Sequence, residues 1–201
     1  MPAKKTYHHG DLKNALIRAG VEILAEQGVG GLSLRQVALR AGVSHAAPYA
    51  HFADKQSLIA AISTDGFQRL YEKLADAANA NRADPRQQLL ETANAYLEFA
   101  ADDPARFKVM FSGILEQEKD YPEFVEASQT NYELVVEIVQ TCQAAGVLPP
   151  GPAERTAISI WATVHGLAAL ALERQIPHAL LEQNSMRGLL GQALQTYFVS
   201  R

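Results

Sequence analysis

The chain has 201 residues, of which 48% are hydrophobic and 20% are charged, with 13 glycines, 9 prolines and a single cysteine. This composition argues against collagen-like, disordered and disulfide-scaffold proteins, and Cys142 alone can form neither an intrachain disulfide nor a cysteine zinc site. The net charge of −4 is unevenly spread: residues 1–60 hold 7 basic and 4 acidic side chains, whereas residues 61–201 hold 11 basic and 18 acidic ones. A basic N-terminal part on an acidic body is compatible with binding to nucleic-acid phosphates.

The same features predict a reducing, cytoplasmic location. The N-terminal segment, MPAKKTYHHGD, is polar and lacks the apolar core of a signal peptide. The longest uncharged stretch covers the 17 residues 156–172. At about 1.5 Å per residue it is too short to cross a hydrocarbon core of about 30 Å comfortably. We therefore expect a buried helix there and no membrane partner.

Hydrophobic periodicity predicts helices along almost the whole chain and no strand. The first amphipathic stripe is expected to end at Gly28, before a loop over 28–31. Ser33, with Gln36 three residues later, has the pattern of a capping box and predicts a second helix that stops at Gly42.

Ser44 can cap a third, short helix that reaches Phe52, and Asp54 can cap a long one over 55–81. Aspartate–proline and glycine–proline pairs then mark several helix starts, because proline fits the first helical position. The remaining helices are expected over 85–102, 104–116, 122–145, 152–174 and 186–198. The fold class is therefore all-α, with about nine helices.

Residues 33–52 have the organisation of a helix-turn-helix, in which two short helices meet at a tight turn. Ala38 is small where the two helices approach, and Gly42 allows the positive φ that reverses the chain. Val43 and Phe52 provide apolar contacts that hold the second helix against the first. The exposed face of that helix can then present polar side chains to phosphates or base edges.

This pattern resembles the TetR family of one-component transcriptional regulators. The resemblance covers roughly residues 9–60 and rests on the glycine-rich loop, the Ser33 cap, Ala38, Ala41-Gly42-Val43-Ser44, Tyr49, His51-Phe52, Lys55 and Leu58. It implies a helix-turn-helix DNA-binding domain over 1–65 (motif 33–52) and an effector-binding and dimerisation domain over 66–201.

The resemblance also implies which side chains meet DNA. Bases are expected to be contacted by His45 and Ala46. The expected DNA-binding set is completed by Arg35, Ser44, Tyr49, His51 and Lys55, the last four of which fall where family members touch phosphates. The segment Ala46-Ala47-Pro48 departs from the family pattern, because Ala47 lacks a hydroxyl and Pro48 lacks an amide donor. Ala46 or Ala47 could instead meet a thymine methyl group.

Other chemistry finds little support. A metal site at His8, His9 and Asp11 is conceivable, but adjacent histidines near a terminus are more often solvated. The resemblance suggests that this segment, with Lys4 and Lys5, contacts phosphate instead. Cys142 has no adjacent base and is expected to be a plain helical residue. Since no GxSxG, HExxH, P-loop or Rossmann pattern occurs, we expect no enzyme, no metal and no cofactor.

A set of aromatic, methionine and histidine side chains is either core or the lining of an effector pocket. At helical spacing core is the commoner role, whereas the resemblance favours a pocket for a small apolar or amphipathic molecule. His165 is either a satisfied core histidine or a polar group at the pocket floor. The candidate ligand-binding residues are Tyr96, Phe99, Phe107, Met110, Phe111, Tyr132, Trp161 and His165.

Acidic side chains crowd one connection, at Glu116, Glu118, Asp120, Glu123 and Glu126. A solvated loop and a helix start explain them, since acids are favourable at a helix N-terminus. A pocket mouth that attracts cations is the alternative.

The helices over 152–174 and 186–198 carry more apolar surface than one core can use. Two copies of each could form a four-helix bundle around a twofold axis. The expected dimer-interface residues are Val164, Leu167, Leu190, Leu194 and Tyr197.

The sequence thus predicts a homodimeric, ligand-responsive transcriptional regulator, most often a repressor in this family, bound to a palindromic DNA operator. A small molecule bound between the 55–81 and 152–174 helices would tilt the former and separate the two DNA-reading helices. The alternatives are an accessory DNA-binding factor without an effector, and a helical small-molecule-binding protein without DNA function.

Overall fold

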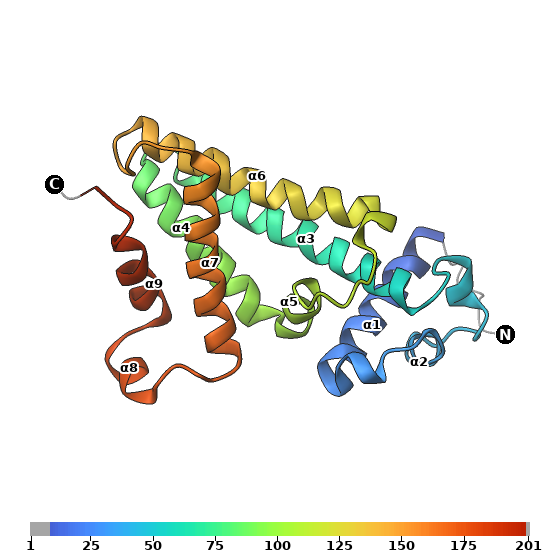
Figure 1. Ribbon diagram of the computed structural model, residues 1–201. Coiled ribbons are helices and arrows are strands. Elements are labelled where there is room, and N and C mark those ends of the chain that lie inside the picture. Colours follow the sequence, from blue (N-terminus) through green and yellow to red (C-terminus); the bar gives the residue numbers. More distant parts are fainter. Residues whose placement is uncertain (1–8, 200–201) are drawn as a thin grey trace. The chain divides into compact units, whose positions relative to one another are not determined.

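The computed structural model describes residues 9–199, and the side chains of residues 12–199. This part of the chain contains nine α-helices, two 3₁₀ helices and no strand (Figure 1), so the all-α prediction is confirmed. The chain forms two compact units. Unit 1 comprises the described residues up to Gly66 together with Ala105–Val125, and unit 2 comprises Phe67–Pro104 together with the described residues from Glu126 onward.

Unit 1 contains α1 (His9–Gly31), α2 (Leu34–Arg40), the 3₁₀ helix η1 (Ala47–Ala50) and the first part of α3 (Lys55–Ala80). Its core is made of aliphatic side chains from these helices, including Leu16, Ile23, Val37, Leu58 and Ile62, each no more than 1% exposed. The backbone leaves the helical conformation at Gly28, with φ 65°. The predicted break at Gly28 is therefore present, although residues up to Gly31 form another helical turn and not an open loop.

The segment 105–125 was expected in the C-terminal domain but packs with unit 1. It includes most of α5 (Pro104–Met110) and the 3₁₀ helix η2 (Glu118–Asp120). Arg106, only 5% exposed, forms an ion pair with Asp65 of α3. Gly66 lies against Met110 so closely that a Cβ at Gly66 would be 2.5 Å from the methionine sulfur. These contacts fasten α5 to the first part of α3.

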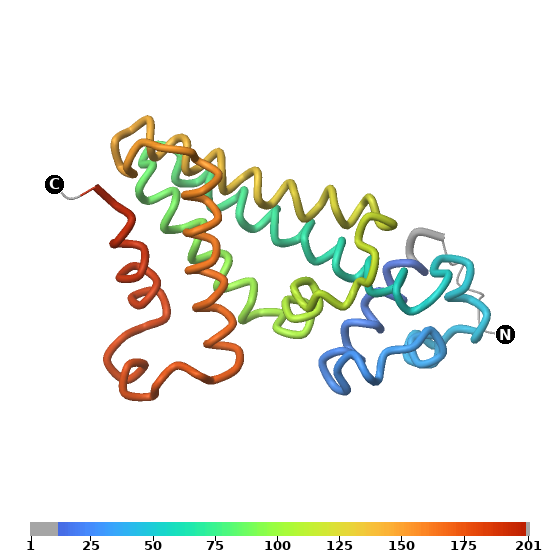
Figure 2. Tube along the Cα trace, viewed as in Figure 1, coloured from blue at the N-terminus to red at the C-terminus, as the bar shows by residue number. Residues whose placement is uncertain are grey.

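Unit 2 contains the rest of α3, α4 (Pro85–Asp102), most of α6 (Pro122–Ala144), α7 (Ala153–Leu172), α8 (His178–Gln183) and α9 (Met186–Gln195). Helix α4 packs against both α7 and α9, which also contact each other; Figure 2 traces their paths. The predicted aspartate–proline start of α4 is present, because the Asp84 carboxylate accepts hydrogen bonds from the backbone N–H groups of Arg86 (3.0 Å) and Gln87 (3.1 Å).

One predicted helix is shorter in the structure, and one helix of the structure was not predicted. The helix expected over 104–116 ends at Met110, because Gly113 adopts φ 64° and the chain reverses there. Helix α8 was not expected at all. Its six residues give the described chain nine α-helices even though the third short helix of the prediction is only a 3₁₀ turn.

Three of the predicted dimer-interface residues are already buried within the single chain. Val164, Leu190 and Leu194 are 3%, 1% and 0% exposed there, which leaves them little surface to offer a partner. The reason is that the apolar stripe of α9 is used against α4 and α7 of its own subunit. Leu167 and Tyr197 are only half-buried and remain candidates.

The prediction that residues 156–172 form a buried helix is also wrong. Only 22% of the most apolar window of α7 is buried within the chain, and Ile158 and Leu170 are 46% and 50% exposed. By length and composition alone α7 could cross a membrane, which for a single helix is weak evidence. One side of α7 therefore presents apolar surface that this chain does not cover.

Candidate DNA-binding surface and ligand cavity

The first helix of the helix-turn-helix begins and ends as its sequence predicts. The Ser33 hydroxyl accepts a hydrogen bond from the Gln36 N–H at 3.2 Å and so caps α2. At the other end Gly42 has φ 68°, and the Val43 N–H donates to the Ala38 carbonyl at 3.0 Å. Ala38 is fully buried, which leaves room for the following segment to pass close to α2.

The second element is a 3₁₀ turn over Ala47–Ala50 and not the helix predicted from Ser44 to Phe52. Its N-cap is Ala46, which has no side-chain capping bond, so the predicted Ser44 cap is wrong. The cause is Pro48: an α-helix that starts at Ser44 needs the N–H of residue 48 to donate to the Ser44 carbonyl, and proline has none. That carbonyl accepts instead from the Ala47 N–H at 3.0 Å, a bond to the third residue that is typical of a 3₁₀ helix.

The structure brings most of the expected DNA-binding residues to the surface around this turn. Ser44, His45, Ala46 and Tyr49 are all exposed, with Tyr49 at 62%, and Arg35 is exposed on α2. Large exposed aromatic side chains are uncommon on protein surfaces. An exposed tyrosine beside hydroxyl and imidazole groups is suited to hydrogen bonds with a phosphate backbone.

His51 and Lys55 are placed differently from the rest of that set, since both are half-buried. The Lys55 ammonium donates to the Val29 carbonyl at 2.6 Å, next to the break in α1 at Gly28. The same carbonyl also accepts a hydrogen bond from the Leu32 N–H at 3.3 Å. Lys55 begins α3, where the Asp54 carboxylate accepts from the Ser57 N–H at 2.8 Å and the Asp54 N–H donates to the Ser57 hydroxyl at 3.0 Å.

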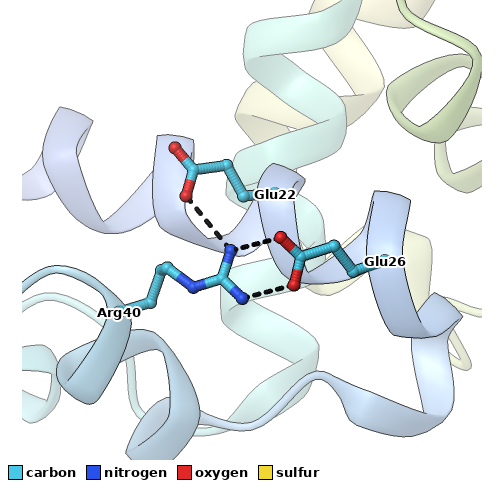
Figure 3. Close-up of polar contacts among 3 residues, drawn as sticks. All are labelled: Glu22, Glu26 and Arg40. Carbon is cyan, nitrogen blue, oxygen red and sulfur yellow. Dashed lines mark hydrogen bonds and ion pairs between the residues drawn. The ribbon is translucent and has the colours of Figure 1, made fainter.

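An arginine clamp joins α2 to α1 (Figure 3). The Arg40 guanidinium donates to both carboxylate oxygens of Glu26 and, at 3.3 Å, to Glu22 one turn earlier. The hydrogen bond from Arg40 holds the pKa of the Glu26 carboxyl below its usual value. Sequence reasoning counted Arg40 among the basic residues of the N-terminal part. In the structure its charge is directed at two acids of the same unit.

Unit 2 contains a small cavity of about 30 Å³ between α3, α4, α6 and α7. Tyr96 and Trp161 of the predicted ligand set lie in its wall, together with Leu74, Leu89, Thr92, Ala93, Val135, Ile138, Ile160 and Val164. The α4 members recur at positions 89, 92, 93 and 96, a helical spacing that could have identified this face from the sequence. A drug-sized ligand needs about 300–1,000 Å³, so this conformation has room for little more than water.

A hydrogen-bonded chain of three aromatic residues borders this cavity. The Trp161 Nε1–H donates to the Tyr96 hydroxyl at 3.3 Å, and that hydroxyl is 2.8 Å from His165 Nδ1. Burial raises the pKa of Tyr96 and lowers that of His165, so both groups are held neutral. Because the indole N–H donates to the Tyr96 oxygen, the tyrosine O–H is free to donate to Nδ1 of a neutral His165 that carries its own proton on Nε2. His165 is thus a satisfied histidine next to the cavity.

The rest of the predicted ligand set is dispersed. Phe99 is buried in unit 2, and Tyr132 is half-buried there, donating to the Glu154 carbonyl at 2.9 Å with its ring 6.2 Å from that of Trp161. The other three belong to unit 1, where Phe107 and Phe111 have ring centroids 5.0 Å apart and Met110 contacts Gly66. The three residues of unit 1 are therefore not part of the cavity wall in unit 2.

The described side chains contain no group of three histidine, cysteine or carboxylate residues that could hold a metal ion. The side chains of Lys4, Lys5, His8, His9 and Asp11 lie outside the described residues. Cys142 is fully buried, donates to the Pro85 carbonyl at 3.0 Å and has a pKa raised by burial to about 11. A thiol in this state is a poor nucleophile, which agrees with the plain helical role that its sequence context suggests.

Two family models match separate parts of the chain. Residues 16–62 match the model described as "Bacterial regulatory proteins, tetR family". Residues 89–192, just over half of the chain, match the model described as "Tetracyclin repressor-like, C-terminal domain". The first match contains α2, η1 and the start of α3, and the second contains most of α4, all of α5 to α8 and much of α9.

Individual proteins give the same picture. A structure of a protein with unknown function from Rhodococcus sp. RHA1 is 36% identical, with a TM-score of 0.81 over 96% of both chains. A putative tetR family transcription regulator from Shewanella sp. PV-4 is 20% identical, with a TM-score of 0.72 over 94% of this chain and 99% of that one. The uncharacterized HTH-type transcriptional regulator YobS of Bacillus subtilis is 26% identical over 99 residues. This match covers 49% of this chain and about half (51%) of that relative's length.

Proposed function

Since the chain belongs to the TetR family of transcriptional regulators, we propose that it is a cytoplasmic homodimer that represses transcription from a palindromic operator and is released by a small molecule. The observation that carries the DNA-binding part is the exposed group Ser44, His45 and Tyr49 around the η1 turn. Two copies related by a twofold axis would place these turns in successive major grooves.

Within this surface the residues divide by role. Tyr49 and Ser44, with Arg35, are proposed to contact phosphates, which fix the register without reading sequence. His45 and Ala46 are proposed to meet base edges. The half-buried His51 and Lys55 contribute mainly by holding the turn, in addition to any phosphate contact.

The test combines selection of genomic fragments by the purified protein with binding measurements on the fragment recovered. Tyr49→Ala should weaken specific and non-specific DNA binding alike by roughly fivefold, the loss expected for one hydrogen bond. His45→Ala should instead reduce the discrimination between operator variants. Tyr71→Ala removes an exposed tyrosine of unit 2 and serves as the matched control. Unchanged affinity of Tyr49→Ala at moderate salt would contradict the assignment of this surface.

A second copy of the chain is proposed to cover the exposed apolar side of α7 and the neighbouring α8. Ile158 and Leu170 on α7 and Leu180 and Leu181 on α8 are 40–50% exposed. Exposed apolar side chains gathered on two consecutive helices are typical of a protein interface, and half-buried Leu167 lies on α7 as well. This set replaces the three buried leucine and valine positions in the proposed dimer interface.

The effector is proposed to be a small apolar or amphipathic molecule that enlarges the unit 2 cavity. The described cavity wall is apolar apart from Thr92 and the polar atoms of the Tyr96–Trp161 pair. Helix α3 begins in unit 1 and continues in unit 2, so a shift of its second part can reach the DNA-binding residues. To release DNA, the effector must bind the conformation that cannot bind DNA more tightly than the conformation that can.

The cavity volume of about 30 Å³ favours a second candidate function, an accessory DNA-binding factor without any effector. The effector-responsive repressor and the accessory factor predict different results in a metabolite screen that uses operator affinity as its readout. Because Trp161 is the only tryptophan and lies in the cavity wall, its fluorescence supplies an independent signal for ligand entry. Operator affinity and Trp161 fluorescence that stay constant across the screen would support the accessory factor.

A further inference from the structure

Unit 1 has a hollow of its own, with a volume of about 190 Å³. It lies next to the η1 turn that presents Tyr49, which is called the recognition turn below. Its wall is formed by Lys13 of α1, by His51 and Phe52 after η1, by one side of α3, and by the η2–α6 connection around Tyr121. It is larger than the cavity of unit 2 and is separate from it, because the two share no residue. We propose that this hollow is a binding site for a small organic ammonium ion.

The wall combines an aromatic base with an acidic edge. Phe52 and Phe124 are 2% and 6% exposed and supply the apolar base. Asp120 and Glu123 are exposed at the edge, and within residues 12–199 neither forms an ion pair. Aromatic faces beside carboxylates are the surroundings that favour a cation with an apolar body.

The balance of charge selects a cation over an anion. Asp120 and Glu123 face a single lysine, Lys13, in the wall. The pKa of Tyr121 is raised, first by burial and then by the negative charges of Asp54, Asp120 and Glu116. The Tyr121 hydroxyl therefore lies in a negative potential to which residues outside the wall also contribute. The acidic connection noted in the sequence thus borders a defined hollow.

The volume limits the ligand. About 190 Å³ is below the range for drug-sized molecules, so the site suits an amine that carries one ring or a short chain. Such a molecule can place its ring on Phe52 and Phe124 while its ammonium group meets Asp120 or Glu123.

Occupancy should act on DNA binding, because the wall is bonded to the recognition turn. The N–H groups of His51 and Phe52 both donate to the Pro48 carbonyl at 2.9 Å. A ligand that packs on these two residues restrains the segment that presents Tyr49. The bound ammonium also offsets acidic charge on the DNA-binding unit, which reduces repulsion of phosphates. The expected effect is therefore tighter DNA binding.

The test titrates the 201-residue protein with phenethylammonium chloride at constant ionic strength, followed by calorimetry and by backbone-amide NMR. We expect saturable binding with a Kd of about 1 mM or tighter, and amide shifts centred on His51, Phe52 and Tyr121. The neutral analogue 2-phenylethanol, which has the same shape, should bind at least about fivefold more weakly. Absence of saturation by about 10 mM, equal binding of the alcohol, or shifts centred on Trp161 in unit 2 would each overturn the proposal.

Paired variants separate the site from general charge effects. Asp120→Asn/Glu123→Gln should weaken binding of the amine about fivefold, as expected for loss of two solvent-exposed charge contacts. Glu118→Gln/Glu137→Gln removes two acids that do not line the hollow and should bind as the wild type does. Equal affinities in the two double variants would overturn the assignment of the edge.

The coupling to DNA binding is tested on a random-sequence DNA duplex. The amine should raise the DNA affinity of the wild type and not that of Asp120→Asn/Glu123→Gln. An amine effect on DNA affinity that is the same in both proteins would overturn the coupling between the hollow and DNA binding.

Discussion

Replacing Leu194 by alanine tests whether α9 belongs to the core of its own subunit or to a dimer interface. Leu194 is 0% exposed in the single chain, where α9 packs on α4 and α7. Removing a fully buried leucine side chain to alanine costs about 2–5 kcal/mol, because apolar contacts are lost and a cavity is left. For a chain of this length each kcal/mol lowers Tm by roughly 2–4 °C. The expected decrease for Leu194→Ala is therefore roughly 4–20 °C.

The assay is urea and thermal unfolding followed by the fluorescence of Trp161, which reports on unit 2 because it lies on α7. Protein concentration is held fixed, since dimer dissociation makes Tm depend on concentration. Gln192→Ala, at an exposed position of the same helix, should change Tm by only a degree or two. A Leu194→Ala protein that is as stable as the wild type but monomeric by light scattering would refute the assignment of Leu194 to the subunit core.

Three further predictions follow from burial. Ile158→Arg, at a 46% exposed site of α7, should leave the subunit folded but give a monomer by sedimentation with weakened operator binding; a native-like dimer would contradict the proposed interface. Because burial lowers the pKa of His165, the unfolded state binds more protons below about pH 6.5, so the free energy of unfolding should fall on acidification through that range. The fall should be smaller in His165→Gln, as measured by urea unfolding at pH 7.5 and pH 5.5. Cys142, with its pKa raised to about 11, should react with Ellman's reagent only after unfolding; rapid labelling of the native protein would contradict its burial.

Helix starts were predictable because their cause is local. Asp84 caps α4, Ser33 caps α2 and Asp54 caps α3 in the structure, as the side-chain patterns indicate. A capping bond joins residues two or three positions apart, so the sequence alone contains all of its partners. The same holds for Gly42, whose positive φ follows from its place after α2.

The partner that covers an apolar stripe is not a local property, so the sequence alone could not specify it. The periodicity of α9 predicts that Leu190 and Leu194 are buried, but it does not indicate which element covers them. The structure buries both against the same chain and leaves Ile158 and Leu170 of α7 exposed. The ligand set was affected in the same way, since Tyr96 and Phe107 lie close together in sequence but belong to different units.

The η1 turn shows that one residue can change an element that the surrounding pattern predicts correctly. Ala38, Gly42, Val43 and Phe52 occupy the positions that a helix-turn-helix requires, and the two buried members, Ala38 and Phe52, are in the core of unit 1. Pro48 nevertheless removes the one N–H that would begin an α-helix at Ser44.

The number of basic residues in the N-terminal part overstates the positive charge that can meet DNA, because some of these side chains are bonded within the protein. Of its seven basic residues, Arg40 is directed at Glu22 and Glu26, and the Lys55 ammonium is bonded to the Val29 carbonyl. Each cation used within the protein is one fewer available to displace counterions from DNA, so the salt dependence of binding should be shallower than the composition suggests. DNA affinity must then depend more on the other donors and acceptors around η1, where the structure exposes Tyr49 and His45.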